Sequence, residues 1–118
     1  MVYVDGFVIP VPKVRLDEYR KMARLGRKVW MEHGALGYLE SVADDAPVGK
    51  LTSFPRAVKL KEDEVVVFSW ILFKSRAHRD KVNKLAMNDK RFAGMDMKSM
   101  PFDGKRMIFG GFKTIVSA

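Results

Sequence analysis

The hydrophobic pattern of the chain predicts strands that are buried on both faces. The stretch 2–9 is rich in β-branched and aromatic residues, and apolar side chains occupy both odd and even positions. Residues 64–73 form a second run of this kind, which is almost continuously apolar. Pro10 and Pro12 predict the end of the first strand, because proline cannot donate a hydrogen bond to a neighbouring strand.

Between the two runs the period changes to that of a helix. From about residue 14 to residue 33, apolar and small residues recur at intervals of three and four, the spacing of one helical face. Members of this stripe are Leu16, Tyr19, Ala23, Gly26, Trp30 and His33. Gly34 follows as the residue that suits the left-handed position just after a helix. The stripe therefore predicts a helix that packs one side on the sheet.

The remaining elements complete a βαββαβ order. A second helix is expected to begin after Ser75, a favourable N-cap residue, and to continue at least to Ala86. Residues 35–44 and 106–116 read as two further strands. This order is the split βαβ pattern of ferredoxin-like folds. We therefore predict one α+β domain over residues 1–118, with a four-stranded sheet and both helices on one face.

A sheet of this type leaves its second face without helices. The strands predicted at 2–9 and 64–73 are apolar on both faces, so the second face would expose a large apolar patch. Packing of two such sheets against each other removes the patch from water. The pattern therefore predicts a homodimer.

The chain is strongly basic, with a formal net charge of +8. Residues 13–33 carry seven Lys/Arg against three acidic residues, and residues 74–91 carry seven against two. Such segments are either the solvated outer faces of two helices or surfaces that attract nucleic acid. Proteins that bind single strands combine cations with exposed aromatic rings. Here most aromatic residues lie on predicted strands, so nucleic-acid binding is the weaker hypothesis.

Several features limit the compartment and the cofactor. The chain has no cysteine, no apolar run approaching about 20 residues, and no signal-peptide pattern among its first ten residues. We therefore expect a cytoplasmic protein that does not enter a membrane. Its two histidines lack the spacing of a metal site. We expect no metal and no cofactor.

The segment MPFDGKRMIFGGF (residues 100–112) raises the question of a phosphate-binding loop. Such a loop needs glycines at a turn from a strand into a helix. Here Asp103 and Gly104 precede a predicted strand, and no helix follows Gly110 and Gly111. Adjacent glycines within a strand indicate a bulge, a bend or a close approach of neighbouring atoms. We interpret them as a structural feature of the sheet.

Three separated motifs carry a family resemblance. PFDGKRMIFGGF, GKLTSFPRAVKLKEDEVVVFSW and YVDGFVIPVP together resemble the domain-of-unknown-function family numbered 1428, along essentially the entire chain. The resemblance implies a dimeric α+β barrel, in which two four-stranded sheets come together. Relatives in that superfamily include cofactor-independent monooxygenases, haem-degrading enzymes, chlorite dismutase-like proteins and binding or regulatory modules. The fold alone does not choose among these activities.

The sequence suggests a small, mostly apolar pocket between the first helix, the sheet and the long 45–63 loop. Its ligand would be a small organic molecule, aromatic or acidic. The catalytic candidates are His33 as proton acceptor, assisted by Asp5 or Tyr38. The ligand-binding candidates are Trp30, Arg56, Trp70 and Arg106. A binding protein without catalysis fits these residues nearly as well.

Each candidate has a purely structural alternative. Asp5 can pair with a cation such as Arg106, and His33 suits a helix C-terminus as a cation. Arg56 can form an ordinary salt bridge. The aromatic candidates can be core residues.

Overall fold

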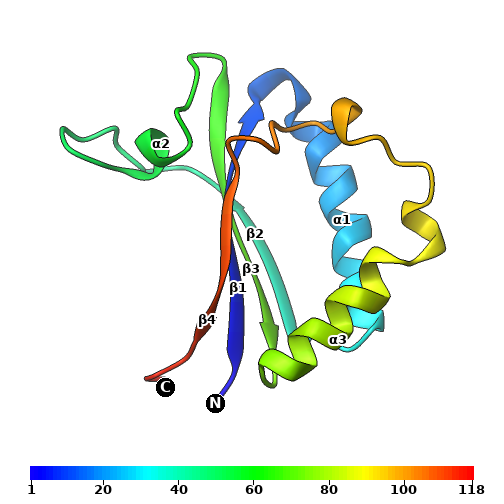
Figure 1. The fold of residues 1–118 in the computed structure, drawn as a ribbon. Helices are drawn as coiled ribbons and strands as arrows, with labels where there is room; N and C mark the ends of the chain where they lie inside the picture. The colour runs from blue at the N-terminus through cyan, green and yellow to red at the C-terminus, as the bar shows by residue number, and fades with distance from the viewer.

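The computed structural model describes all residues 1–118 as two layers, a four-stranded antiparallel sheet with two long helices on one face (Figure 1). The molecule measures 39 × 37 × 20 Å, and the short dimension reflects these two layers. The helices and strands are β1 (Tyr3–Pro12), α1 (Leu16–Glu32), β2 (Gly37–Val42), α2 (Phe54–Ala57), β3 (Glu64–Phe73), α3 (Arg76–Met87) and β4 (Ile108–Lys113), with short 3-10 helices at Lys13–Arg15, Lys90–Phe92 and Met97–Ser99.

The sheet has the strand order β2-β3-β1-β4, and every neighbouring pair is antiparallel. The predicted ferredoxin-like α+β fold is therefore confirmed. The helix ends also follow the prediction, since Gly34 has a φ of 116° and the Ser75 side chain accepts a hydrogen bond from the His78 amide. The short helix α2 lies within the expected 45–63 loop and was not foreseen.

The predicted end of the first strand at Pro10 is wrong, because β1 continues to Pro12. On one side β1 pairs with β3 along its whole length, as far as Pro12 opposite Glu64. On the other side the pairing with β4 ends at Val8. The Pro10 carbonyl accepts a hydrogen bond from the Asp103 amide, so the backbone of Pro10 faces away from β3. The missing proline N–H therefore costs the sheet no ladder bond.

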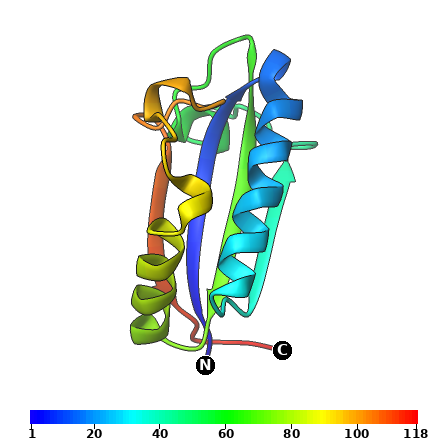
Figure 2. The same ribbon diagram turned by 90° about the vertical axis from the view of Figure 1, so that its right-hand side faces the viewer.

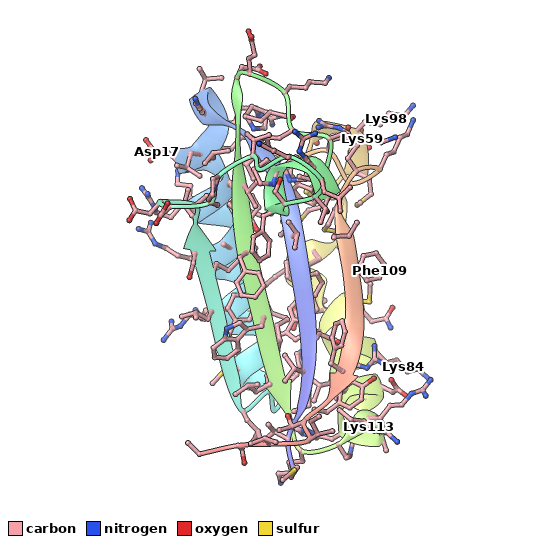
Figure 3. The ribbon with its side chains drawn as sticks, turned by 90° about the vertical axis from the view of Figure 1, so that its left-hand side faces the viewer. Asp17, Lys59, Lys84, Lys98, Phe109 and Lys113 are labelled. Atoms are coloured by element: carbon pink, nitrogen blue, oxygen red, sulfur yellow. The ribbon has the colours of Figure 1, made fainter.

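The two faces of the sheet differ in their cover. Odd-numbered residues of β1 and β3 face the helices and form the core with α1 and α3. Even-numbered residues of these strands, and their neighbours on β2 and β4, form what we call the open face. Its members are Val4, Leu39, Phe68, Trp70, Leu72, Ile108 and Phe112. No helix covers most of this face (Figure 3).

The segment 45–63 covers one end of the open face, and α2 lies on the side of the sheet opposite α1 and α3 (Figure 1). Val58 is fully buried against Val8 and Val66. The ring centre of Phe54 lies 5.9 Å from that of Phe68. The predicted pocket therefore cannot form as expected within one chain, because α1 and the 45–63 segment lie on opposite faces.

The segment 88–107, which we call the strap, connects α3 to β4 along the helix side of the molecule (Figure 2). Its Phe92 ring lies 5.8 Å from the ring of Trp30, measured between centres. Arg15 holds the far end of the strap by donating hydrogen bonds to the carbonyls of Ser99 and Met100. The strap is thus held near both ends of α1.

The paired glycines of β4 cause no bulge, since Gly110 and Gly111 pair with Gly6 and Asp5 in regular register. Their role is the close approach of a neighbouring side chain. A Cβ atom at Gly111 would overlap the ring and hydroxyl of Tyr3. The second glycine therefore makes room for Tyr3 on the helix-facing side.

Candidate functional site

The structure distributes the seven predicted site residues over separate regions. Asp5, Trp30 and Tyr38 lie between the sheet and the helices, His33 caps the end of α1, Trp70 lies on the open face, and Arg56 and Arg106 lie at the end of the sheet where β1 ends and β3 begins. Sequence reasoning placed them in one pocket, and the structure does not bring them together.

The region between sheet and helices contains a buried polar network, the helix-side cluster, made of Tyr3, Asp5, Trp30, Arg79 and Asn83. Asp5 is 6% exposed and accepts a hydrogen bond from the Asn83 amide nitrogen at 3.3 Å. The Asn83 oxygen accepts a hydrogen bond from the Trp30 indole at 2.9 Å. The cluster thus connects β1, α1 and α3 through side chains far apart in sequence.

Arg79 supplies the positive charge of the helix-side cluster. Its guanidinium lies 3.5 Å from the Asp5 carboxylate and donates a hydrogen bond to the Tyr3 hydroxyl at 3.1 Å. It also lies 5.1 Å from the centre of the Tyr3 ring, within the range of a cation–π interaction. Its Nε is buried and makes no well-directed hydrogen bond, although the Asp80 carboxylate is 3.1 Å away. A buried donor of this kind is costly unless a partner satisfies it.

The carboxyl of Asp5 holds its proton more tightly than an ordinary aspartate does, because its pKa is raised. Burial raises the pKa of Asp5, while the hydrogen bond from Asn83 and the charge of Arg79 act in the opposite direction. Burial has the larger effect. A carboxyl with a raised pKa in the interior, beside a specific charge partner, is a recognised mark of functional sites.

A second buried cluster joins α1 to β2. Both carboxylate oxygens of Glu40 accept hydrogen bonds, one from Tyr19 and one from Tyr38 at 2.7 Å. Burial, followed by the charge of Glu40, raises the pKa of both phenols above their ordinary value. The Tyr38 oxygen lies where a side chain on Gly26 would be, because a Cβ there would be 2.8 Å away. Gly26 therefore lets α1 approach β2 closely enough for Tyr38 to reach Glu40.

The sheet register places the two clusters beside each other. Asp5 pairs with Ile71, and Ile71 pairs with Tyr38, so the three residues form one row across the helix-facing side. Two strand spacings of about 4.8 Å separate Asp5 from Tyr38. Trp30 and Phe7 pack on the same core. The arrangement is an apolar floor with an acidic group on one side and a phenol on the other.

His33 does not join these clusters. It is the C-cap residue of α1, and its Nε2 lies 2.8 Å from the Asp89 carboxylate of the strap. Arg91 donates to Asp89 and also to Glu32. The hydrogen bonds from Arg91, followed by the contact with His33, lower the pKa of Asp89. His33 therefore belongs to an ionic cluster that fixes the strap to α1.

The expected pairing of Asp5 with Arg106 is wrong. Arg106 donates to both oxygens of Glu64, at 2.6 and 2.8 Å, and to Asp103 at 2.7 Å. Glu64 and Arg106 are largely buried, and the hydrogen bonds from Arg106 lower the pKa of Glu64. This ion pair joins the start of β3 to the segment before β4.

Arg56 and Trp70 also lie outside the helix-side cluster. Arg56 donates hydrogen bonds to the carbonyls of Val48 and Gly49, within its own loop. Trp70 lines an apolar hollow of about 600 Å³ on the open face, together with Phe68, Phe112 and residues 113–116. The ligand-binding roles of both residues remain predictions.

Sequence reasoning missed Arg79, Asn83, Tyr19 and Glu40. Arg79 and Asn83 are four residues apart, so they share one helical face with the buried Val82. That spacing was a usable signal, but the run of cations in α3 obscured it. No three His, Asp or Glu side chains are gathered in a way that could hold a metal ion. None of the helices combines the length and apolar composition needed to cross a membrane.

The fold and these clusters define a ferredoxin-like α+β protein with a polar network beneath its helices. The chain belongs to the family described as "Protein of unknown function (DUF1428)", whose profile matches residues 2–104. It is 50% identical over 116 residues to "Uncharacterized protein YbaA" of Escherichia coli strain K12, and the match covers 98% of each chain. The YbaA protein of Shigella flexneri shows the same identity and coverage.

Proposed function

We propose that the protein works as a homodimer joined through its open face. The chain exposes 8306 Å² of surface, whereas a folded monomer of 13.5 kDa exposes about 6500 Å². The excess of about 1800 Å² is more than the roughly 800 Å² that each partner buries in a standard interface. Phe68 and Phe112 are 44% and 62% exposed. A second copy provides a matching apolar face of equal size.

The assembly is tested by multi-angle light scattering on a sizing column. We expect a mass of two chains at micromolar concentration, with dissociation only on strong dilution. A monomer that persists at 100 μM, roughly the top of the range usually probed for specific homodimers, would contradict the proposal. A cytoplasmic location is part of the same proposal.

For the biochemical function, we propose binding of a small organic molecule, aromatic or acidic, at the helix-side cluster. The observation that carries this proposal is the largely buried guanidinium of Arg79, which lies 3.5 Å from the Asp5 carboxyl and makes no well-directed hydrogen bond through its Nε. Aromatic side chains, Trp30 and Phe7, lie next to these polar groups. Ligand sites combine apolar walls with a few convergent polar groups in this way. An acidic group of the ligand would accept a hydrogen bond from the Arg79 guanidinium, whose Nε is otherwise in contact only with the Asp80 carboxylate.

If the bound molecule also reacts, Asp5 is the proton acceptor that the geometry favours. Its raised pKa brings it closer to the range useful for proton transfer. Tyr38 lies in the same row of the sheet and can assist as a donor. The earlier hypothesis that His33 accepts the proton has less support, because Asp89 engages this histidine. If the protein oxidises an aromatic ligand without a cofactor, dioxygen is the oxidant that accepts the electrons and Asp5 is the residue that takes up the proton.

Trp30 and Trp70 lie on opposite sides of the sheet, so the fluorescence of each can report binding on its own side. We would titrate benzoate and salicylate, as simple aromatic acids, into single-tryptophan variants and follow the fluorescence. Trp70→Phe retains Trp30 as the reporter, and its emission should change on binding. Trp30→Phe retains Trp70 on the open face, and its emission should not change.

Variants of the polar groups complete this experiment. Arg79→Gln in the Trp70→Phe background should weaken binding at least tenfold, a loss typical of removing a charged hydrogen-bond partner. Arg20→Gln is the matched control, because Arg20 lies on the exposed face of α1 and pairs only with Asp17. Binding reported by Trp70 alone would place the ligand on the open face and overturn the proposed site.

Binding of nucleic acid through α1 and α3 has less support. Apart from Arg79, the cations of these helices are exposed. The exposed aromatic rings lie on the sheet and α2, and they are Phe54, Phe68, Phe109 and Phe112. Stacking platforms and cations therefore lie on different surfaces. Submicromolar affinity for a mixed-sequence RNA at physiological salt would reverse this preference.

A further inference from the structure

The end of the sheet where β1 ends and β3 begins contains two adjoining hollows. One measures about 480 Å³ and the other about 640 Å³, and Lys61 and Glu64 line both. Together they are lined by eight Lys or Arg and three Glu or Asp, a net charge of +5. The lining of these hollows is therefore strongly basic. Neither the helix-side cluster nor the uncovered part of the open face includes it.

Five of these cations are lysines, and none of the five has a carboxylate within salt-bridge distance. They are Lys13, Lys59, Lys61, Lys98 and Lys105. Two of the three acids in the lining, Glu64 and Asp103, are occupied by the buried Arg106. Glu62 is the third acid of the lining. The central group of Arg106, Glu64 and Asp103 therefore carries a net charge of −1, and the surrounding ammonium groups face solvent.

Lys59 shows that this surface is built at a conformational cost. It follows α2 with a φ of 48° and is the only residue other than glycine with a positive φ. Its amide donates to the Arg56 carbonyl, and the next amide, of Leu60, donates to the Pro55 carbonyl. Glycine or asparagine usually occupies this position after a helix, because other side chains cost about 1 kcal/mol there. A lysine at this position points to a need for its ammonium group.

We propose that the two hollows form a binding site for a small soluble anion with several negative charges, of the phosphate or diphosphate class. Their volumes fall within the range of ligand pockets, about 300–1000 Å³. Several unpaired ammonium groups around one concave surface attract such an anion. Phe102 is the sole aromatic residue of the lining, so the surface offers little for stacking bases. This absence favours a small anion over a nucleic acid.

Inorganic pyrophosphate is the probe for this site, and isothermal titration calorimetry measures its binding. The double variant Lys59→Glu, Lys98→Glu changes one cation in each hollow. Its matched control is Lys84→Glu, Lys113→Glu, which makes the same change in net charge at the opposite end of the molecule (Figure 3). All four lysines are exposed and unpaired. We expect the first variant to bind pyrophosphate at least tenfold more weakly and the control to bind within threefold of the wild type.

Lys59→Gly separates binding from folding. Glycine adopts a positive φ without strain, so this variant should keep or raise the melting temperature. It should still bind pyrophosphate several-fold more weakly, since it lacks the ammonium group. Loss of affinity in a variant that is at least as stable cannot result from misfolding. Unchanged affinity would remove Lys59 from the site and overturn the proposal.

Three further results would overturn the proposed anion site. The first is no measurable binding of pyrophosphate by the wild-type protein at low salt. The second is an equal loss of affinity in the two charge-reversal variants, which would show attraction by net charge alone. The third is binding of a mixed-sequence RNA that pyrophosphate does not displace but that Lys59→Glu, Lys98→Glu abolishes. That outcome would assign the surface to nucleic acid.

Discussion

The two faces of the sheet differ in polarity, and the covered face contains polar residues while the open face is apolar. The helix-facing side is covered, yet it contains Asp5, Ser69 and Glu40, and the first two are buried. The open face lacks helical cover over most of its area, yet it presents aromatic and aliphatic side chains such as Phe68 and Phe112. A sheet that faces water on one side normally has polar residues there. The difference supports the proposal that a second copy covers the open face in the working protein.

The covered face needs its polar groups for a reason other than solubility. Burying a carboxyl costs free energy unless hydrogen bonds and charges compensate. Asp5 retains a raised pKa even with Asn83 and Arg79 beside it, so the compensation is incomplete. Sites that tolerate such a cost are usually functional. In the proposed arrangement, one face of the sheet serves assembly and the other serves ligand binding.

The largest effect is expected at the ion pair of Arg106 and Glu64, which joins the start of β3 to the segment before β4. Arg106→Met leaves the Glu64 carboxylate buried without its partner and should cost about 3–5 kcal/mol of unfolding free energy. The matched control Arg20→Met removes an exposed pair with Asp17 and should cost less than about 1 kcal/mol. Urea denaturation at one fixed protein concentration measures both.

The pH dependence of this ion pair provides a second measurement. Arg106 lowers the pKa of Glu64 below its ordinary value of 4.5. A carboxyl with a lowered folded-state pKa stabilises the protein above its unfolded pKa and loses this effect as the pH falls. The stability gap between wild type and Arg106→Met should therefore narrow below about pH 4.5. A constant gap would contradict this assignment.

The next effect concerns assembly and uses two phenylalanines of β4 that face opposite sides. Phe112→Lys places a charge on the open face and should raise the dimer dissociation constant about 100-fold, equivalent to about 2.7 kcal/mol. Phe109→Lys alters an equally exposed residue on the helix-facing side, which stacks on Phe7. It should leave the dissociation constant unchanged. Sedimentation equilibrium measures both dissociation constants. Equal increases in the two variants would contradict the assignment of the dimer contact to the open face.

The adjacent glycines of β4 allow the same comparison within two residues. Gly111→Ala places a Cβ against the Tyr3 ring on the helix-facing side and should cost about 1–3 kcal/mol. Gly110→Ala places a Cβ on the open face at 3.8 Å from the Phe112 ring, an ordinary contact, and should be neutral within about 0.5 kcal/mol. Thermal unfolding distinguishes the two. A larger loss for Gly110→Ala would show the face assignment to be wrong.

The smallest effect is a stabilisation by Asp5→Asn. Because the folded-state pKa of Asp5 is raised, its ionisation costs stability as the pH rises above its ordinary pKa of 3.8. The amide has no proton to lose, so the variant should melt higher than wild type at pH 7 and equally near pH 3. Asp45→Asn, at an exposed loop position without a salt bridge, is the control and should show no such trend. A lower melting temperature for Asp5→Asn at pH 7 would mean that Arg79 outweighs burial.

The fold was predictable from the chain because its signals are local. The helical stripe, the Ser75 cap and the left-handed Gly34 each act within a few residues and predicted the helices closely. The prolines of β1 led to a wrong prediction of where this strand ends, because the effect of a proline depends on which side of the strand has a partner. Nothing in the sequence near Pro10 indicates that the pairing of β1 with β4 ends at Val8.

The candidate site was harder to predict because its contacts are distant in sequence. Asp5 meets Asn83 and Arg79 across more than seventy residues, and nothing in the neighbourhood of Asp5 names either partner. The length of the 45–63 segment suggested a functional loop, but length does not determine which face of the sheet it covers. Arg56 was therefore assigned to the wrong side.

The prolines of β1 have a consequence for solubility at high concentration. Beyond Val8 the outer edge of this strand has no partner strand, and such edges recruit strands from other molecules. Pro10 and Pro12 present no N–H there, so a foreign strand cannot complete a ladder along this stretch. The prolines thereby protect this stretch of β1, whereas the outer edges of β2 and β4 have no partner strand. Contact through faces closes after two copies, whereas contact through edges would grow into open-ended aggregates.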